Sequence, residues 1–198
     1  MAETDENLML AVQRGEVSQL GVLFDRHHRS LFDFFARLTG SRSLAEDLVQ
    51  DVFFRILKYR ATFREQSRFK AWMFHIARNA RFDHYRKQQP DAQLSEDGAG
   101  AVPSRSPLPG HEMEQEQQTA LLECALFQLP VEKREVLILS RYQEMKYEQI
   151  AEVMGCEVGT VKVRVHRALK DLREVFLKLS NERMPCNAKK SASNLRIM

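Results

Sequence analysis

The helical pattern of this chain is broken between residues 88 and 111, and this break constrains what the sequence can fold into. Four of the six prolines and three of the eight glycines fall in the segment, QQPDAQLSEDGAGAVPSRSPLPGH. The segment has too little apolar surface to offset the conformational entropy that the chain would lose on folding. We therefore predict a flexible linker over residues 89–112. The chain should therefore fold as two separate parts.

Apolar residues recur at helical spacing on both sides of this linker, and no alternating strand pattern is present. Ser43 is the expected N-cap of a helix at 44–59, with Glu46 in a capping box. The other helices are expected at 6–14, 17–38, 68–87, 112–128, 131–142, 147–154 and 158–179. The predicted fold class is all-α, with small helical domains at 1–88 and 113–180 and a disordered tail at 181–198.

The composition argues against several classes of protein. No apolar run approaches the about 20 residues that a membrane span needs, and the first residues carry acid where a secretory signal carries base. The three cysteines lie far apart without a CxxC pair, which favours reduced thiols over a disulfide framework. His27 and His28 lack the spacing of metal ligands. We expect a cytoplasmic protein with no membrane insertion, metal, cofactor or catalytic residues.

The basic segment VGTVKVRVHRALK, residues 158–170, would form a helix with one apolar side and one cationic side. A three-residue turn containing Gly155 joins it to the short helix at 147–154. This is a helix-turn-helix arrangement, whose second helix enters the major groove of DNA. The residues that we predict to contact DNA are Gly159, Thr160, Lys162, Val163, His166, Arg167 and Lys170.

The chemistry of these side chains suits DNA. The free amides beside Gly159 and Thr160 can approach a phosphate closely. Lys162 and Arg167 can reach guanine acceptors or phosphates, and His166 can hydrogen-bond a base edge. A surface helix with solvated charges is the alternative, but the turn, the spacing and the preceding helix together favour DNA contact.

The helix expected at 44–59 has a mixed face that holds Asp47, Gln50, Asp51, Phe54 and Lys58. A bulky ring among carboxylates is typical of a protein-binding surface. The edge of a broad core stripe would give the same pattern, since Val49, Phe53 and Leu57 are apolar too. The residues alone leave both interpretations open.

One side of the helix expected at 68–87 combines cations with rings, at Phe74, Arg78, Arg81, Phe82 and Tyr85. Cations attract phosphates and rings stack on bases, so this side suits unpaired DNA. The opposite side, with Phe69, Met73, Ile76 and Ala80, is the expected buried side.

Together these segments resemble the bacterial sigma factors of the extracytoplasmic-function (ECF) type. LPVEKREVLILSRYQEM (129–145) and YEQIAEVMGCEVGTVKVRVHRALKDLR (147–173) resemble the C-terminal domain of that family. AEDLVQDVFFRI (45–56) is similar to its polymerase-binding helix, and FKAWMFHIARNARFDHYRK (69–87) to its promoter-melting segment.

The resemblance implies that the chain joins core RNA polymerase, recognises the upstream (minus thirty-five) promoter element with residues 158–170 and melts the downstream (minus ten) element with residues 63–87. It assigns polymerase binding to Asp47, Gln50, Asp51 and Phe53, beside the ring of Phe54. The residues assigned to downstream DNA are Arg78, Asn79, Arg81, Phe82, Tyr85 and Arg86.

The resemblance also implies an anti-sigma partner, and a loop at 63–68 that holds a flipped-out promoter base. The alternative function is a two-domain helix-turn-helix regulator that acts without joining the polymerase, because similar helix pairs occur in such proteins. A regulator of that kind should carry a ligand pocket or a phosphoacceptor site in its N-terminal half. Here that half offers a polymerase-like face and a melting segment instead.

Overall fold

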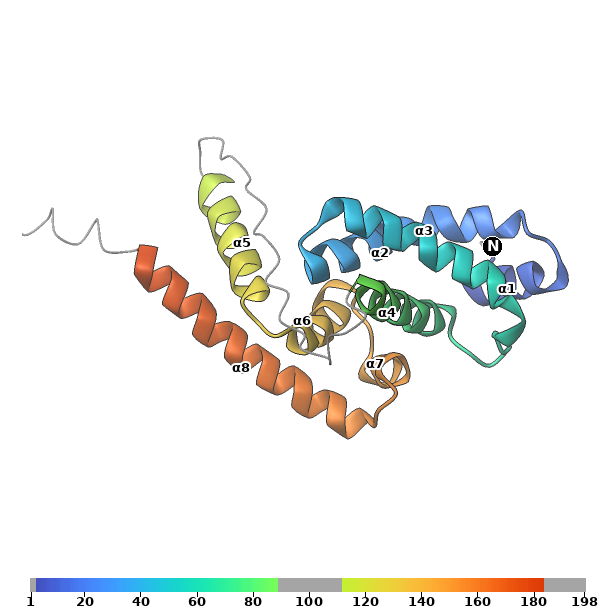
Figure 1. Ribbon diagram of the computed structural model, residues 1–198. Coiled ribbons are helices and arrows are strands. Elements are labelled where there is room, and N and C mark those ends of the chain that lie inside the picture. The colour runs from blue at the N-terminus through green and yellow to red at the C-terminus, as the bar shows by residue number, and fades with distance from the viewer. Residues whose placement is uncertain (1–2, 89–111, 184–198) are drawn as a thin grey trace, which may run out of the picture.

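The computed structural model describes residues 3–88 and 112–183, and all regular elements within these ranges are helical (Figure 1). The N-terminal domain contains α1 (Asp5–Arg14), α2 (Gln19–Thr39), α3 (Arg42–Lys58), the short 3-10 turn η1 (Arg60–Thr62) and α4 (Phe69–Gln88). The C-terminal domain contains α5 (Glu112–Phe127), α6 (Val131–Leu137), the π-helical segment η2 (Ile138–Tyr142), α7 (Tyr147–Met154) and α8 (Val158–Arg183). The all-α fold class is confirmed.

The predicted linker and tail lie almost entirely outside the described residues. Glu112, the last residue of the predicted linker, begins α5, and residues 181–183 of the predicted tail continue α8. None of the described helices is long and apolar enough to cross a membrane.

The N-cap of α3 is Ser41, so the prediction of Ser43 was wrong. Gly40 ends α2 with a left-handed φ of 74°, and the chain leaves it with Ser41 already extended at φ −113°. The Ser41 hydroxyl accepts a hydrogen bond from the Leu44 amide at 3.3 Å. The helix therefore begins two residues earlier than the predicted Leu44. The turn at Gly40 places Ser41, and not Ser43, in the extended conformation of an N-cap.

Large side chains fill the space between α2, α3 and α4. Phe34, Phe35, Phe74 and Ile56 are fully buried, and the Phe34 ring meets the edges of its two aromatic neighbours at 5.2 Å. Burying a Phe or Ile side chain contributes roughly 1.5–3 kcal/mol. This core fixes which sides of α3 and α4 face outward.

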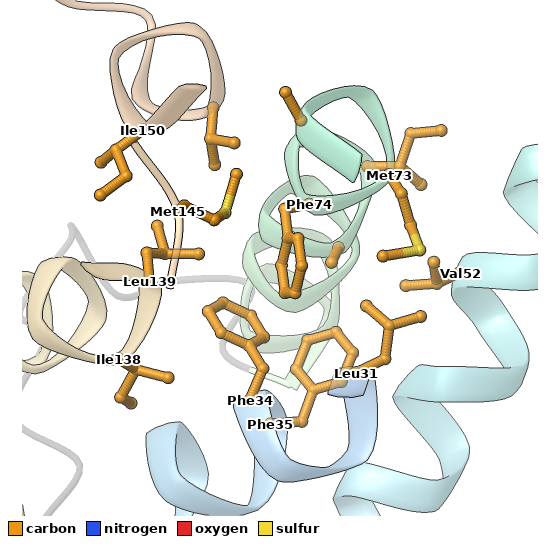
Figure 2. Packing of buried hydrophobic residues seen from close by; sticks show 14 of the residues in the cluster. Leu31, Phe34, Phe35, Val52, Met73, Phe74, Ile138, Leu139, Met145 and Ile150 are labelled. Carbon is orange, nitrogen blue, oxygen red and sulfur yellow. The ribbon is translucent and has the colours of Figure 1, made fainter. Parts of the chain in front are cut away.

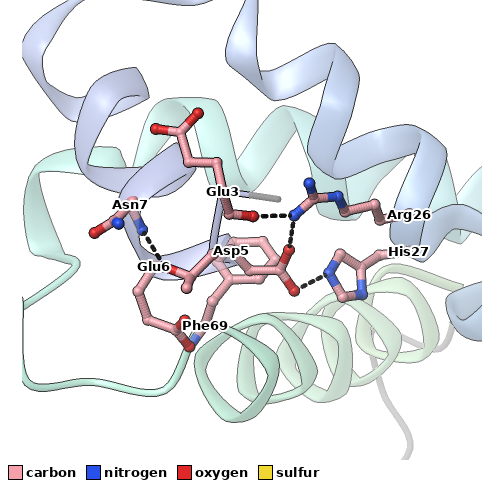
Figure 3. Close-up of polar contacts among 8 residues, drawn as sticks. Glu3, Asp5, Glu6, Asn7, Arg26, His27 and Phe69 are labelled. Atoms are coloured by element: carbon pink, nitrogen blue, oxygen red, sulfur yellow. Dashed lines mark hydrogen bonds and ion pairs between the residues drawn. The ribbon is translucent and has the colours of Figure 1, made fainter. Parts of the chain in front are cut away.

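Two acidic residues at the start of α1 tie it to the rest of the domain (Figure 3). Asp5 receives hydrogen bonds from Arg26 and from the His27 ring, both at 2.7 Å. The Glu6 carboxylate accepts a hydrogen bond from the Phe69 amide at 3.0 Å, so it caps α4 from a distant part of the chain. The N-terminal end of the predicted melting helix is thereby held in place.

In the C-terminal domain, α7 and α8 form the predicted helix-turn-helix. Gly155 ends α7 in the left-handed conformation at φ 61°, which lets the chain turn directly into α8. Ile150 on α7 and Val161, Val165 and Ala168 on α8 are buried. The opposite side of α8 is left facing solvent.

The two domains pack against each other through one continuous apolar cluster. Figure 2 shows Phe34 and Phe74 of the N-terminal domain facing Leu139 and Met145 of the C-terminal domain. Phe74 was placed by helical spacing on the exposed side of its helix, but it is fully buried. Its exposure was predicted incorrectly because α4 is covered on two sides, by α3 together with Phe34 of α2 and by α7.

Candidate polymerase and nucleic-acid interfaces

The exposed side of α8 carries all seven of the residues that we predict to contact upstream DNA. Gly159, Thr160, Lys162, Val163, His166, Arg167 and Lys170 are exposed. Val163 is 49% exposed, so its methyl groups are available to a partner. A Cβ added to Gly159 would meet open space, so packing within the protein does not require glycine there. A small residue at this position instead favours close approach by an external molecule.

The predicted polymerase-binding residues on α3 divide into two groups. Asp47, Gln50 and Phe54 share an exposed face, on which the Phe54 ring is 66% exposed. Asp51 is half-buried and accepts a hydrogen bond from Arg55 at 2.9 Å. Phe53 is buried, and its ring lies edge-on to Phe24 at 4.9 Å. Phe53 therefore supports the surface from below, while Phe54 projects from it.

A groove beside this face was not predicted from the sequence. It has a volume of about 420 Å³ and lies between α2 and α3. Its lining residues are Phe24, His28, Arg29, Phe32, Asp33, Glu46, Val49 and Gln50. Phe24 is 39% exposed, and its ring stacks on that of His28 at 4.9 Å. The repeat of rings at positions 24, 28 and 32 was the available signal, since four-residue spacing places side chains on one helical face.

The predicted downstream-DNA residues on α4 are also divided by their surroundings. Asn79, Tyr85 and Arg86 are exposed. Arg78 and Arg81 instead face the C-terminal domain, and both guanidiniums lie over the Phe82 ring at 4.7 and 4.5 Å. The cation and ring pattern is therefore present, but part of it is covered.

Burial changes the electrostatics of the covered part. Arg81 is only 5% exposed, and burial lowers the pKa of its guanidinium. Among the described residues its Nε has no hydrogen-bond partner. A buried cation without full hydrogen bonding destabilises the folded state, and hydrogen bonds from the guanidinium to a phosphate would offset that cost.

The loop before α4 is held from the side of α1. The Gln13 side-chain amide donates to the carbonyl of Phe63 at 3.1 Å and to those of Arg60 and Ala61 at 3.2 and 3.3 Å. The Phe63 ring is buried and meets the Trp72 ring edge-on at 5.2 Å. Phe63 therefore anchors the loop, and the exposed side chains of residues 64–66 and 68 are the ones free to contact a base.

Comparisons with known proteins agree with both halves of this arrangement. Residues 23–90 match the family described as Sigma-70 region 2, and residues 119–172 match Sigma-70, region 4. The ECF RNA polymerase sigma factor EcfG of Rhodopseudomonas palustris is 38% identical over 148 residues, covering 72% of this chain and 77% of that protein. The RNA polymerase sigma factor CarQ of Myxococcus xanthus is 32% identical over 161 residues, covering 81% of this chain and 90% of that protein.

A solved structure is similar across both domains. It is the sigma factor RpoE in complex with the anti-sigma factor NepR, from Bartonella quintana. The TM-score is 0.63 at 30% sequence identity, covering 80% of this chain and 96% of that chain.

The chain is thus a transcription initiation factor of the sigma-70 type, with regions 2 and 4. Within that class it belongs to the ECF RNA polymerase sigma factors. The membership selects the sigma-factor interpretation over the one-component regulator. It also means that the polymerase, and not this chain, carries out the chemistry of transcription.

Proposed function

We propose that this sigma factor captures core polymerase with the exposed face of α3 at Asp47, Gln50 and Phe54, together with the adjoining α2–α3 groove. The observation that carries the proposal is the Phe54 ring, 66% exposed beside acidic and amide side chains. An aromatic ring that a folded domain leaves in water is typical of the centre of a protein interface. Asp51 and Phe53 hold this face in shape from its edge and from below.

The two DNA elements are then assigned to two helices. The exposed side of α8, from Gly159 to Lys170, recognises the upstream element in the major groove. The side of α4 that holds Arg78, Asn79, Arg81, Phe82, Tyr85 and Arg86 binds the melted downstream strand. Both assignments combine cationic side chains with groups that can read or stack on bases.

We also propose that this chain works in the cytoplasm and is controlled by an anti-sigma factor. The supporting observation is the similarity to RpoE of Bartonella quintana, a sigma factor whose structure was solved with the anti-sigma factor NepR. The exposed apolar surface around Phe24 and Phe54 is available to such a partner as well as to the polymerase.

The double variant Asp47→Arg with Gln50→Ala tests the polymerase-binding face. We expect polymerase capture to fall by a factor of about 100 or more, because reversing charge in an interface costs several kcal/mol. Helical circular dichroism and thermal unfolding should remain unchanged, since both side chains are exposed. Glu16→Arg is the matched control, because Glu16 is an exposed acid outside α3, in the turn between α1 and α2, and undergoes the same change of charge. If the double variant folds normally and binds core polymerase as well as wild type does, this surface is not the binding face.

A further inference from the structure

The C-terminal domain covers the part of α4 that we assign to downstream DNA. Arg78 pairs with Glu135 of α6 at 3.3 Å, and Glu135 is 1% exposed. The His75 ring lies 3.3 Å from the Val153 carbonyl of α7. Arg81, one helical turn after Arg78 on α4, is buried in the same interface and interacts electrostatically with Glu135. In this arrangement Arg81 is closed to single-stranded DNA, and Arg78 keeps only 24% of its side chain exposed.

Polar contacts on α2 and α4 hold the two domains together around this point. The Gln143 side chain accepts a hydrogen bond from the Ser30 hydroxyl and donates one to the Ser30 carbonyl at 3.1 Å. Its backbone carbonyl accepts from the Lys70 ammonium at 2.6 Å. Arg134 donates to the Leu38 carbonyl at 2.8 Å, across the same interface. These four hydrogen bonds form only while the domains are in contact.

The charges at the centre of the interface are unbalanced. Arg78 pairs with the Glu135 carboxylate, Arg81 interacts electrostatically with Glu135 and Glu132, and Arg134 is repelled by Arg81. Three cations against two carboxylates, of which only Glu135 is buried, leave an excess of positive charge in a mostly buried cluster. Burying charge without full compensation costs free energy and weakens the packing of the two domains. A polyanion that binds the guanidiniums can therefore compete with this packing.

We infer that the contact between Glu135 of α6 and Arg78 of α4 is an autoinhibitory latch. In the free protein the C-terminal domain rests on α4 and masks Arg78 and Arg81 from single-stranded DNA. The recognition side of α8 stays exposed, so the free protein retains an accessible duplex-binding face. Core polymerase binds the two domains separately. It thereby exposes Arg78 and Arg81 of α4 only when a promoter can be opened. This inference rests on the assignment of α4 to downstream DNA made above.

The Glu135→Gln variant tests the latch without altering any residue assigned to DNA. It removes the buried carboxylate that pairs with Arg78 while keeping the side-chain shape. The probe is a fluorescent single-stranded DNA of random sequence and about 12 nucleotides, because stacking and phosphate attraction tolerate any sequence. We expect the free variant to bind this probe about tenfold or more tightly than wild type, since opening raises the binding-competent fraction. Small-angle scattering should show a larger radius of gyration at unchanged helical content.

Gln143→Ala is a second variant that weakens the same closed state by a different route, through the loss of its bonds to Ser30. It should change probe binding in the same direction. Glu152→Gln is the matched control, because Glu152 is an exposed carboxylate on α7 and its loss changes the net charge equally. Its affinity for the probe should equal that of wild type.

The outcomes separate the latch from the proposed function. All four proteins should support promoter-dependent initiation with core polymerase if the proposed function is correct. If Glu135→Gln and Gln143→Ala stay as compact as wild type and bind the probe no more tightly, the latch is refuted while the function stands. The latch is equally refuted if both variants open and the probe affinity does not rise. Failure of wild type to initiate with polymerase would instead refute the proposed function.

Discussion

Side chains along the exposed side of α8 differ in what they can reach on a DNA duplex. Lys162 and His166 lie one turn apart with free polar ends, while Lys170 lies a further turn along and has the Glu174 carboxylate 4.0 Å from its ammonium. The N-terminal residues of a recognition helix contact base edges, and more distant cations contact the backbone. These three residues should therefore contribute differently to promoter choice.

We predict that Lys162→Ala and His166→Ala each change the preference at particular upstream bases, at a cost of about 1–3 kcal/mol. Lys170→Ala should weaken all promoters about equally, because a phosphate contact carries no sequence information. Initiation in vitro from a library of upstream sequences measures both effects. An unchanged base preference at every upstream position in the first two variants would show that the recognition side is assigned wrongly.

At this scale, periodicity alone predicted some residues well and others not at all. The spacing of Val161 and Val165 places Val163 outward, and the structure agrees. Arg134 could not be predicted, although it is 5% exposed and donates to the carbonyls of Leu38, Leu126, Phe127 and Leu129. An arginine in a charged segment gives no sign that its partners are backbone carbonyls brought together by folding.

Two helices with different proposed partners are joined by one side chain. Arg55 of α3 donates to Asp51 on its own helix at 2.9 Å and to Asp83 of α4 at 2.6 Å. Asp83 also accepts from Arg86 at 2.7 Å. The helices α3 and α4 are therefore fixed relative to each other by charge-assisted hydrogen bonds as well as by the core.

The hydrogen bond from Arg55 holds the pKa of Asp83 below its usual value. Because the folded pKa is depressed, the pairing stabilises the fold above the unfolded pKa of about 3.9, and this stabilisation is lost as pH falls through the folded pKa. Asp83→Asn should lower the unfolding free energy by up to about 1 kcal/mol near pH 6, the size of a partly exposed pair. The difference should shrink below about pH 4.

Denaturant unfolding across this pH range measures the effect. Asp25→Asn is the control, since Asp25 is an exposed acid on α2, and its stability should follow that of wild type. A stability difference for Asp83→Asn that is constant from about pH 6 to pH 2 would contradict this role for the pair.

The sequence predicted the elements more reliably than their ends and surroundings. The helix Tyr147–Met154 was predicted with its observed bounds, because a strong apolar period precedes a glycine. The side of α4 that periodicity left in solvent proved to be covered in part, at Phe74 and Arg81, as well as the side assigned to the core. A helix covered by two layers lacks the single apolar stripe on which such assignments depend.

For the whole molecule, the arrangement of the two domains is the property that the sequence could not predict. Helix positions follow from local spacing, but the packing of α4 on α7 joins residues far apart in the chain. The apolar cluster around Phe34, Phe74 and Leu139 is continuous across the boundary. A free protein in this closed form leaves the α8 side exposed and covers part of α4, so we expect it to bind promoters weakly by itself.

A gel-shift titration with and without core polymerase tests this account most directly, using a duplex promoter identified from transcripts that overexpression induces. The free protein should bind weakly and with strong salt dependence, near the ~10⁻⁴–10⁻⁶ M typical of non-specific binding. Adding core polymerase should produce specific binding and an open complex. Specific binding at ~10⁻⁸ M or tighter by the free protein, unaltered by polymerase, would contradict the account.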